Sequence, residues 1–252
     1  MAEKIDPIHQ FQLVKIGQPL FHIGGTEVVL TQSSLYMIGA VALITIVMLM
    51  GTAGRSLVPG RLQSLVEVMY EFVASTVRSS AGHDGMKFFP LVFSLFMFVL
   101  VLNLAGMMPY GFTVTSHIII TAALAVLVIL TVIIYGFMKH GLRFLGLFAP
   151  SGMHPVMLVI LVPIEVISFI SRPISLSVRL FANMLAGHIA LKIFAGFVVT
   201  LLGAGLWGII SPLPLALAVA LTALEFLVAV LQAYVFATLT SIYLHDALHP
   251  GH

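Results

Sequence analysis

The sequence predicts an all-α integral membrane protein, and two observations support this prediction. Of the 252 residues, 60% are hydrophobic and only 8% are charged, whereas about 25% charged residues is usual in a soluble domain. Residues 28–54, 88–138 and 193–224 contain no Asp, Glu, Lys or Arg. A membrane-spanning helix needs roughly 20 mostly apolar residues, so the second of these segments has room for two.

We expect a single membrane domain over residues 1–252, beginning with an outer N-terminal segment at residues 1–32. Residues 1–27 carry three carboxylates and lack an apolar core followed by a cleavage site. No signal peptide is therefore predicted, and the first apolar segment should remain in the mature protein. That segment, residues 33–50, is the first predicted span, and it ends at the turn-forming run GTAG.

Residues 61–80 have a different pattern from the spans. Apolar side chains recur there at helical spacing and form a stripe of Leu62, Leu65, Val66, Met69, Val73 and Val77. The charged residues Glu67, Glu71 and Arg78 lie off that stripe. This pattern predicts an amphipathic interfacial helix, at the membrane surface or against partner helices. A packed loop helix on the cytoplasmic side is the alternative, and GHDG at 82–85 indicates a turn.

A helical hairpin is predicted next, over residues 88–138. Its two helices lie at about 88–107 and 116–138, separated by MPYG. A polar, glycine-rich loop is expected from residue 139 to residue 152.

The last predicted unit is a long helical hairpin over residues 155–245. Residues 155–193 contain no clear turn, only Pro163 and Pro173, which kink a helix without necessarily ending it. One helix over this stretch would be about 58 Å long, against a hydrocarbon core of about 30 Å. The final helix, at about 213–244, is also too long to stand upright. Two strongly tilted helices are favoured over additional spans.

Lysine and arginine in the short loops predict the orientation. Loops 51–87 and 139–154 carry basic residues, whereas loops 108–116 and 203–213 carry none. The basic loops should therefore face the cytoplasm, with the N-terminus outside and the C-terminus inside. About five membrane crossings satisfy this alternation.

Four ionisable residues lie deep in the last hairpin: Glu165, Arg172, Arg179 and Glu225. A charge at the bilayer centre costs roughly 2.5–3.5 kcal/mol on insertion scales, so each needs a partner, water or a function. On a helical wheel the first three share one face with Asn183, within about 40°. A second polar face on the final helix carries Glu225, Ala229, Gln232 and Tyr243, with Thr240 at its edge.

These two faces allow a functional and a purely structural interpretation. His188 points away from the Arg179 stripe, so it is expected to face the neighbouring helix and reach Glu225. Alternatively, Glu165 and Arg172 neutralise each other, and Asn183 and Gln232 make ordinary interhelical hydrogen bonds. Arg179 differs because its nearest carboxylates in the sequence are distant, which indicates a partner from another chain.

Three stretches resemble one family. They are SRPISLSVRLFANMLAGH at 171–188, EFLVAVLQAYVFATLTSIYL at 225–244 and NLAGMMPYG at 103–111. Together they resemble subunit a of F-type ATP synthases, the membrane stator subunit beside the rotating c ring. The opening DPIHQFQL is similar to the alphaproteobacterial branch.

The resemblance implies roles for individual residues. Arg179 would be the essential arginine that faces the c-ring carboxylate. Asn183 and Gln232 would be polar residues of that interface. Glu165 would be an acidic position on the same long helix as Arg179. His188 with Glu225 is similar to the mitochondrial-type arrangement of these two residue types, which other members exchange. Arg172, Asn103 and Tyr243 are secondary candidates.

Together with the orientation, these roles predict two half-channels separated by Arg179. The outer one would pass Glu225, His188, Asn183 and Gln232, and the inner one would lie near Glu165. The implied partners are the c-ring subunits, peripheral-stalk b-type subunits and the lipid of an energy-transducing membrane, most simply the bacterial inner membrane. No cofactor or metal is expected, and the chain would be a subunit rather than an enzyme by itself.

Other functions remain open or are excluded. A small secondary transporter is the main alternative, because midplane charges and broken helices mark those proteins too. For a haem anchor, His140 and His154 are separated by residues that interrupt a common helix. The net charge of +2 is too small to indicate nucleic acid as a partner, and the absence of cysteine excludes disulfides and thiolate metal sites.

Overall fold

The computed structural model is almost wholly helical, which confirms the predicted fold class. It describes residues 16, 21–23, 26–54, 58–108, 111–148, 155–203 and 205–248. In these parts of the chain, five helical segments are long and apolar enough to cross a membrane: Gln32–Ala53, Arg61–Gly106, Ile118–Leu147, Val156–Gly203 and Gly208–Leu248. The strands β1 (Phe21–Ile23) and β2 (Thr26–Val28) form a short antiparallel hairpin before the first helix.

Four helices form the main bundle: α3 (Phe89–Gly106), α4 (Ile118–His140), α5 (Pro155–Gly203) and α6 (Pro212–Leu248). Helix α6 is central, since it packs against the other three and against α2 (Arg61–Gly85). Its buried positions include Ala229, Ala233 and Ala237. Small side chains at these positions let the neighbouring backbones approach closely.

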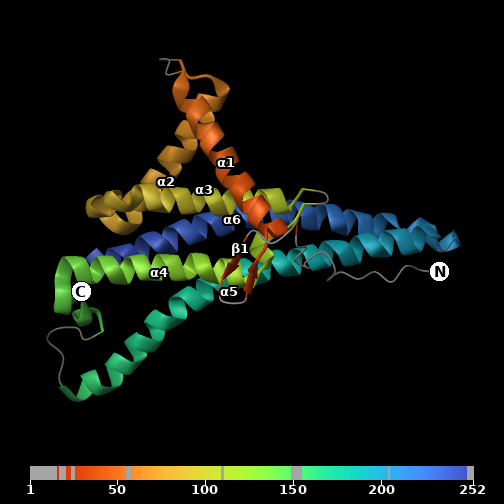
Figure 1. Ribbon diagram of the computed structural model, residues 1–252. Coiled ribbons are helices and arrows are strands. Elements are labelled where there is room, and N and C mark those ends of the chain that lie inside the picture. The colour runs from red at the N-terminus through yellow and green to blue at the C-terminus, as the bar shows by residue number, and fades with distance from the viewer. Residues whose placement is uncertain are drawn as a thin grey trace.

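The predicted long hairpin is confirmed as α5 and α6. These helices have 49 and 37 residues, or about 74 and 56 Å at 1.5 Å per residue. Both far exceed a hydrocarbon core of about 30 Å, so they must be strongly inclined if they lie within it. Figure 1 shows α5 rising from one corner, bending, and then running beside α6 past the ends of α3 and α4. Pro163 and Pro173 lie inside α5 without ending it.

Helices α1 (Gln32–Ala53) and α2 project together from the bundle (Figure 1). The amphipathic pattern predicted for 61–80 is present in part of α2, where Val66, Val73 and Val77 are buried and Glu67 and Glu71 are exposed. Leu65, which the prediction placed on the buried stripe, is exposed. Apolar packing against α1, α3 and α6 accounts for that stripe.

Two predicted irregular segments differ from the structure. The residues predicted to form a turn at 82–85 belong to helix α2 instead. Within α2 the backbone departs from helical geometry at Gly82, which has a φ of 67°. Part of the loop expected at 139–152 is the 3-10 helix η4 (Gly141–Leu147). Its Phe144 is buried on Gly136 of α4, where a Cβ would overlap the ring. Tertiary packing of one aromatic side chain thus orders a segment that its glycines suggested was a loop.

Short 3-10 helices make the remaining connections. These are η2 (Met86–Phe88) before α3, η3 (Val114–Ser116) between α3 and α4, and η5 (Gly205–Ile210) between α5 and α6. Helix η3 packs against both α3 and α5, so it lies inside the bundle rather than on its surface.

Candidate functional site on the α5–α6 hairpin

Helix α5 carries two arginines on one side. Arg172 and Arg179 are seven residues apart, a separation that places them about 10 Å apart along the axis and close to the same angle. Leu176, between them in sequence, and Leu180, directly after Arg179, are buried in the bundle. An apolar stripe of α5 thus faces the bundle. The arginines lie on another side of the helix, which faces either α6 or the exterior.

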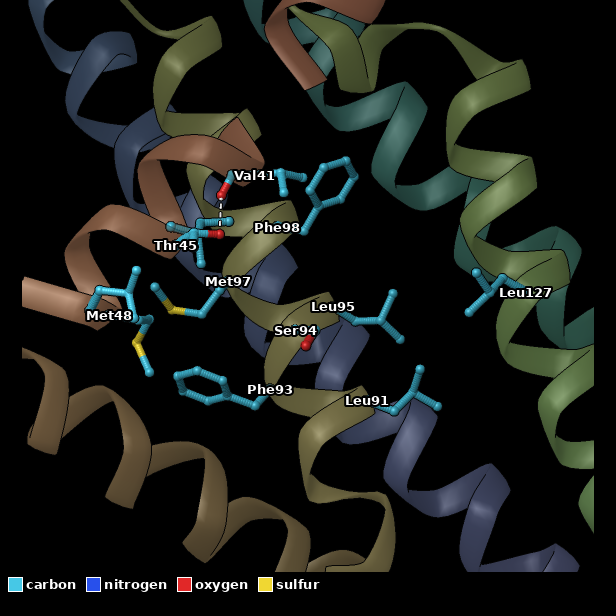
Figure 2. Close-up of a pocket in the computed structure, with 12 residues that line it drawn as sticks. Val41, Thr45, Met48, Leu91, Phe93, Ser94, Leu95, Met97, Phe98 and Leu127 are labelled. Carbon is cyan, nitrogen blue, oxygen red and sulfur yellow. Dashed lines mark hydrogen bonds between the residues drawn. The ribbon is translucent and has the colours of Figure 1, made fainter. Parts of the chain in front are cut away.

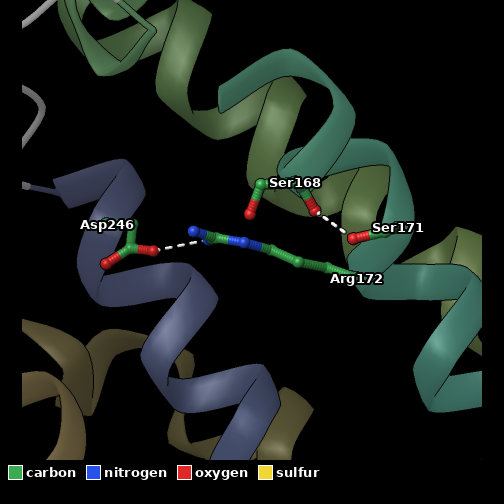
Figure 3. Close-up of polar contacts among 4 residues, drawn as sticks. All are labelled: Ser168, Ser171, Arg172 and Asp246. Carbon is green, nitrogen blue, oxygen red and sulfur yellow. Dashed lines mark hydrogen bonds and ion pairs between the residues drawn. The ribbon is translucent and has the colours of Figure 1, made fainter. Parts of the chain in front are cut away.

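Arg172 is neutralised within the chain. Its Nη1 donates a hydrogen bond of 2.6 Å to Oδ2 of Asp246 on α6 (Figure 3), and the two side chains are only 25% and 27% exposed. The guanidinium also lies over the ring of Tyr243, 5.2 Å from its centroid, and 5.9 Å from that of Phe169. Arg172 therefore pairs with the neighbouring helix rather than with Glu165 on its own helix.

Arg179 is arranged differently. Its side chain is exposed, and in the described part of the chain no carboxylate lies within ion-pair distance of it. Tyr243 is close enough to both arginines to be affected by their charges. Asn183, one turn further along α5, is exposed as well. This permanent cation is therefore not neutralised by any carboxylate of the described residues.

Glu225 is buried where α5 and α6 meet, with only 9% of its surface exposed. Its carboxylate lies against Gly187, at a position that a Cβ would occupy. Next along α5 is His188, whose Nε2 is enclosed. Neither that nitrogen nor either oxygen of Glu225 has a hydrogen-bond partner in the structure. His188 therefore lies next to the Gly187–Glu225 crossing and makes no hydrogen bond to Glu225, so the His188–Glu225 pair remains a prediction.

The polar face of α6 is buried along its length. Gln232, Thr240 and Tyr243 have 9%, 0% and 8% of their surfaces exposed. Asn103 on α3 reaches the same face, because its Nδ2 donates a hydrogen bond of 3.2 Å to the carbonyl oxygen of Ala229, one turn from Glu225. The structure therefore groups Asn103, Gln232 and Glu225 inside the bundle and leaves Asn183 on the exposed side with Arg179.

Two further charged residues lie on α5. Glu165 is half-buried, fourteen residues before Arg179, which is about 21 Å along the axis. It is therefore well separated from the Glu225 crossing. Lys192 was not singled out by the sequence patterns. It is half-buried one turn beyond His188 and close enough for its charge to act on the imidazole; its spacing of four residues from His188 is the signal that could have identified it.

A separate cavity of about 590 Å³ lies between α1, α3 and Leu127 of α4 (Figure 2). Its two hydroxyl groups are satisfied by their own helices, since Thr45 donates to the Val41 carbonyl at 2.8 Å and Ser94 to the Pro90 carbonyl at 2.7 Å. The rest of its lining is apolar, so it offers no proton-carrying group.

The histidine pair considered for a haem anchor finds no support. His140 is engaged in a hydrogen bond of 3.0 Å between its Nε2 and the carbonyl oxygen of Leu248. This contact joins the ends of α4 and α6. His154 lies outside the described residues.

The fold, with five helical segments in its described parts that are long and apolar enough to cross a membrane, defines a multi-pass membrane protein. Residues 34–245 match the family model described as ATP synthase A chain. The chain is 69% identical to ATP synthase subunit a of Methylobacterium sp. (strain 4-46), with both chains covered completely. It is 65% identical to that of Mesorhizobium japonicum, covering 100% of this chain and 99% of the relative. The chain therefore belongs to the ATP synthase A chain family, as the resemblance implied.

Proposed function

We propose that this chain is the proton-translocating stator subunit of the ATP synthase membrane sector, with Arg179 separating two half-channels that open toward a ring of c subunits. The main support for this proposal is the difference in ion pairing between the two arginines of α5. Arg172 is paired with Asp246, while Arg179 is exposed and has no carboxylate partner in the described part of the chain.

The chemistry of arginine suits this role. Its guanidinium stays protonated even where the ammonium group of a lysine would lose its proton. A fixed positive charge attracts a passing rotor carboxylate and favours its ionised form. The carboxylate must then release its proton before it passes Arg179, and a proton cannot slip directly from one half-channel to the other.

The buried crossing at Glu225 supports an outer half-channel. We assign Glu225, His188 and Gln232 to it, with Asn103 beside them and Asn183 leading to Arg179. Glutamate and histidine suit proton exchange because their surroundings can tune both toward neutral pH. Their enclosed, unpartnered atoms are free to bond to water or to each other as protons pass.

The inner half-channel is assigned to the region of Glu165, on the far side of Arg179 along α5. With the basic loops on the cytoplasmic side, this arrangement places the N-terminus outside and the C-terminus in the cytoplasm of a bacterial inner membrane. A proton crossing 100 mV yields about 2.3 kcal/mol, and any leak past Arg179 would waste that energy.

The c ring would pass along the exposed side of α5. Ala182 and Ala186 flank Arg179 and Asn183 there and are exposed too. Small residues allow a helix of another subunit to approach closely. Peripheral-stalk b-type subunits and lipid would cover other exposed apolar surfaces of the chain.

The test is Arg179→Ala in the assembled complex, with inverted membrane vesicles energised by respiration. We expect coupled ATP synthesis to be lost and passive proton conduction to rise. Arg78→Ala, at an exposed arginine on α2, is the matched control and should behave like the unaltered complex. Normal ATP synthesis by the Arg179→Ala complex would refute the assignment.

A further inference from the structure

Several polar atoms on α3, α5, α6 and the α3–α4 connection are enclosed and have no hydrogen-bond partner in the structure. They are Oδ1 of Asn103, Oγ1 of Thr115, Nε2 of His117, Nε2 of His188 and both carboxylate oxygens of Glu225. Leaving a buried polar group unpaired is unfavourable, and native proteins usually satisfy such groups with ordered water. The accumulation of six such atoms indicates a hydrated space.

Helix η3 brings Thr115 and His117 to the end of α3. A Cβ at Gly106, in the last turn of α3, would come within 3.0 Å of Cγ2 of Thr113. The His117 ring stacks on Phe112, with centroids 5.1 Å apart. Thr115 itself is fully buried. These contacts hold the segment that carries both polar side chains against the last turn of α3, the helix that also carries Asn103.

The position along α5 follows from a second contact. Oγ1 of Thr121, in the first turn of α4, lies 3.1 Å from Oγ of Ser177 on α5. Because α4 and α5 run in opposite directions (Figure 1), residues before Thr121 pack further along α5, toward Gly187. Helix η3 also contacts α5 directly. It therefore lies between the level of Arg179 and the level of Glu225.

The residue types at this place can carry protons through water. A threonine hydroxyl both donates and accepts, and a neutral imidazole offers one donor and one acceptor. Burial lowers the pKa of His117 below its ordinary value, which favours the neutral form at pH 7. Water held by three or four such groups meets the requirement for a buried site.

We propose that Thr115 and His117 are further members of the outer proton path and enclose water that continues from Asn103 to Glu225. This inference rests on the proposed function, because it extends the same half-channel. It adds two residues of the α3–α4 connection to a path otherwise assigned to α3, α5 and α6.

The chain contains no cysteine, so single cysteines introduced into the full complex can be probed with Ag⁺. Thr115→Cys and Val114→Cys form a matched pair, since both residues are fully buried in the same turn. We expect Ag⁺ to reduce proton-driven ATP synthesis severalfold in the Thr115→Cys complex and to leave the Val114→Cys complex unchanged. Asn183→Cys, on the exposed side, serves as the positive control.

Equal insensitivity of Thr115→Cys and Val114→Cys, with Asn183→Cys inhibited, would overturn the water path and leave the proposed function intact. The proposed function fails separately, if Arg179→Ala still supports synthesis. If the Thr115→Cys complex does not assemble, a comparison of the proton conduction rates of His117→Gln and His117→Leu complexes tests the water path instead. The glutamine variant keeps a donor and an acceptor and should conduct protons faster, at equal assembly, than the leucine variant. Wild-type conduction by assembled His117→Leu would refute the role of His117.

Discussion

The carboxylate of Glu225 on α6 occupies the place where a side chain of residue 187 on α5 would begin. Only glycine leaves that space open, so the two helices can cross with an ionisable group enclosed between them. The proton-carrying group that we propose for the outer path is thus positioned by the absence of a Cβ on the opposite helix.

Gly187→Ala should therefore impair function without weakening its helix. The methyl group would displace the Glu225 carboxylate, while alanine is favoured over glycine inside helices by about 1 kcal/mol. We expect severalfold slower proton-driven ATP synthesis with unchanged assembly. Gly203→Ala is the control, because Gly203 also lies on α5 and has open space around its Cα. Equal activity of the two variants would argue against the positioning role.

Glu225→Gln keeps the size of the side chain and removes its titratable proton. We expect a slower proton uptake rate in an assembled complex, because glutamine cannot accept and release a proton near neutral pH. The measurement is the proton conduction rate of vesicles between pH 6 and pH 8. Glu67→Gln, at an exposed carboxylate on α2, should change nothing. Identical rates for Glu225→Gln and the unaltered complex at every pH would contradict an uptake role.

Asp246→Asn should destabilise the α5–α6 contact. It leaves the guanidinium of Arg172 partly buried without its counter-charge, which we expect to cost about 1–2 kcal/mol because both side chains are about one quarter exposed. The ion pair of Lys87 with Asp84, at 3.9 Å with 68% and 57% of the side chains exposed, provides the comparison. Asp84→Asn should cost less than about 0.5 kcal/mol. Thermal unfolding in detergent measures both, and equal shifts would contradict the difference in burial.

The hydrogen bond between Thr121 and Ser177 predicts energetic coupling between α4 and α5. Thr121→Val and Ser177→Ala should each lower the free energy of unfolding by about 1 kcal/mol. The double variant should lose less than the sum, because the second substitution removes a hydroxyl that the first has already left unpaired. Thr131→Val is the control, since that exposed hydroxyl bonds only to Leu127 on its own helix. Strict additivity would show that the contact contributes nothing.

Much of the fold follows from local sequence patterns. The spans, the stripe of α2 and the hairpin of α5 and α6 depend on apolar length and helical period, which are properties of contiguous residues. The order in η4 does not follow from such patterns, because it depends on Phe144 packing on Gly136. The hydrated region proposed at Thr115 and His117 was not predicted either, because these residues are enclosed only once α3 and α5 pack against the α3–α4 connection.

The amino-acid sequence is sufficient to identify a membrane protein with long apolar helices that contain Arg172, Arg179 and Glu225. Those conclusions need only composition and spacing, because the cost of placing a charge in lipid is the same whatever the fold. Which of the two arginines is neutralised depends instead on how the helices pack. Asp246 reaches Arg172 because α6 passes it there, whereas no helix of the described chain brings a carboxylate to Arg179.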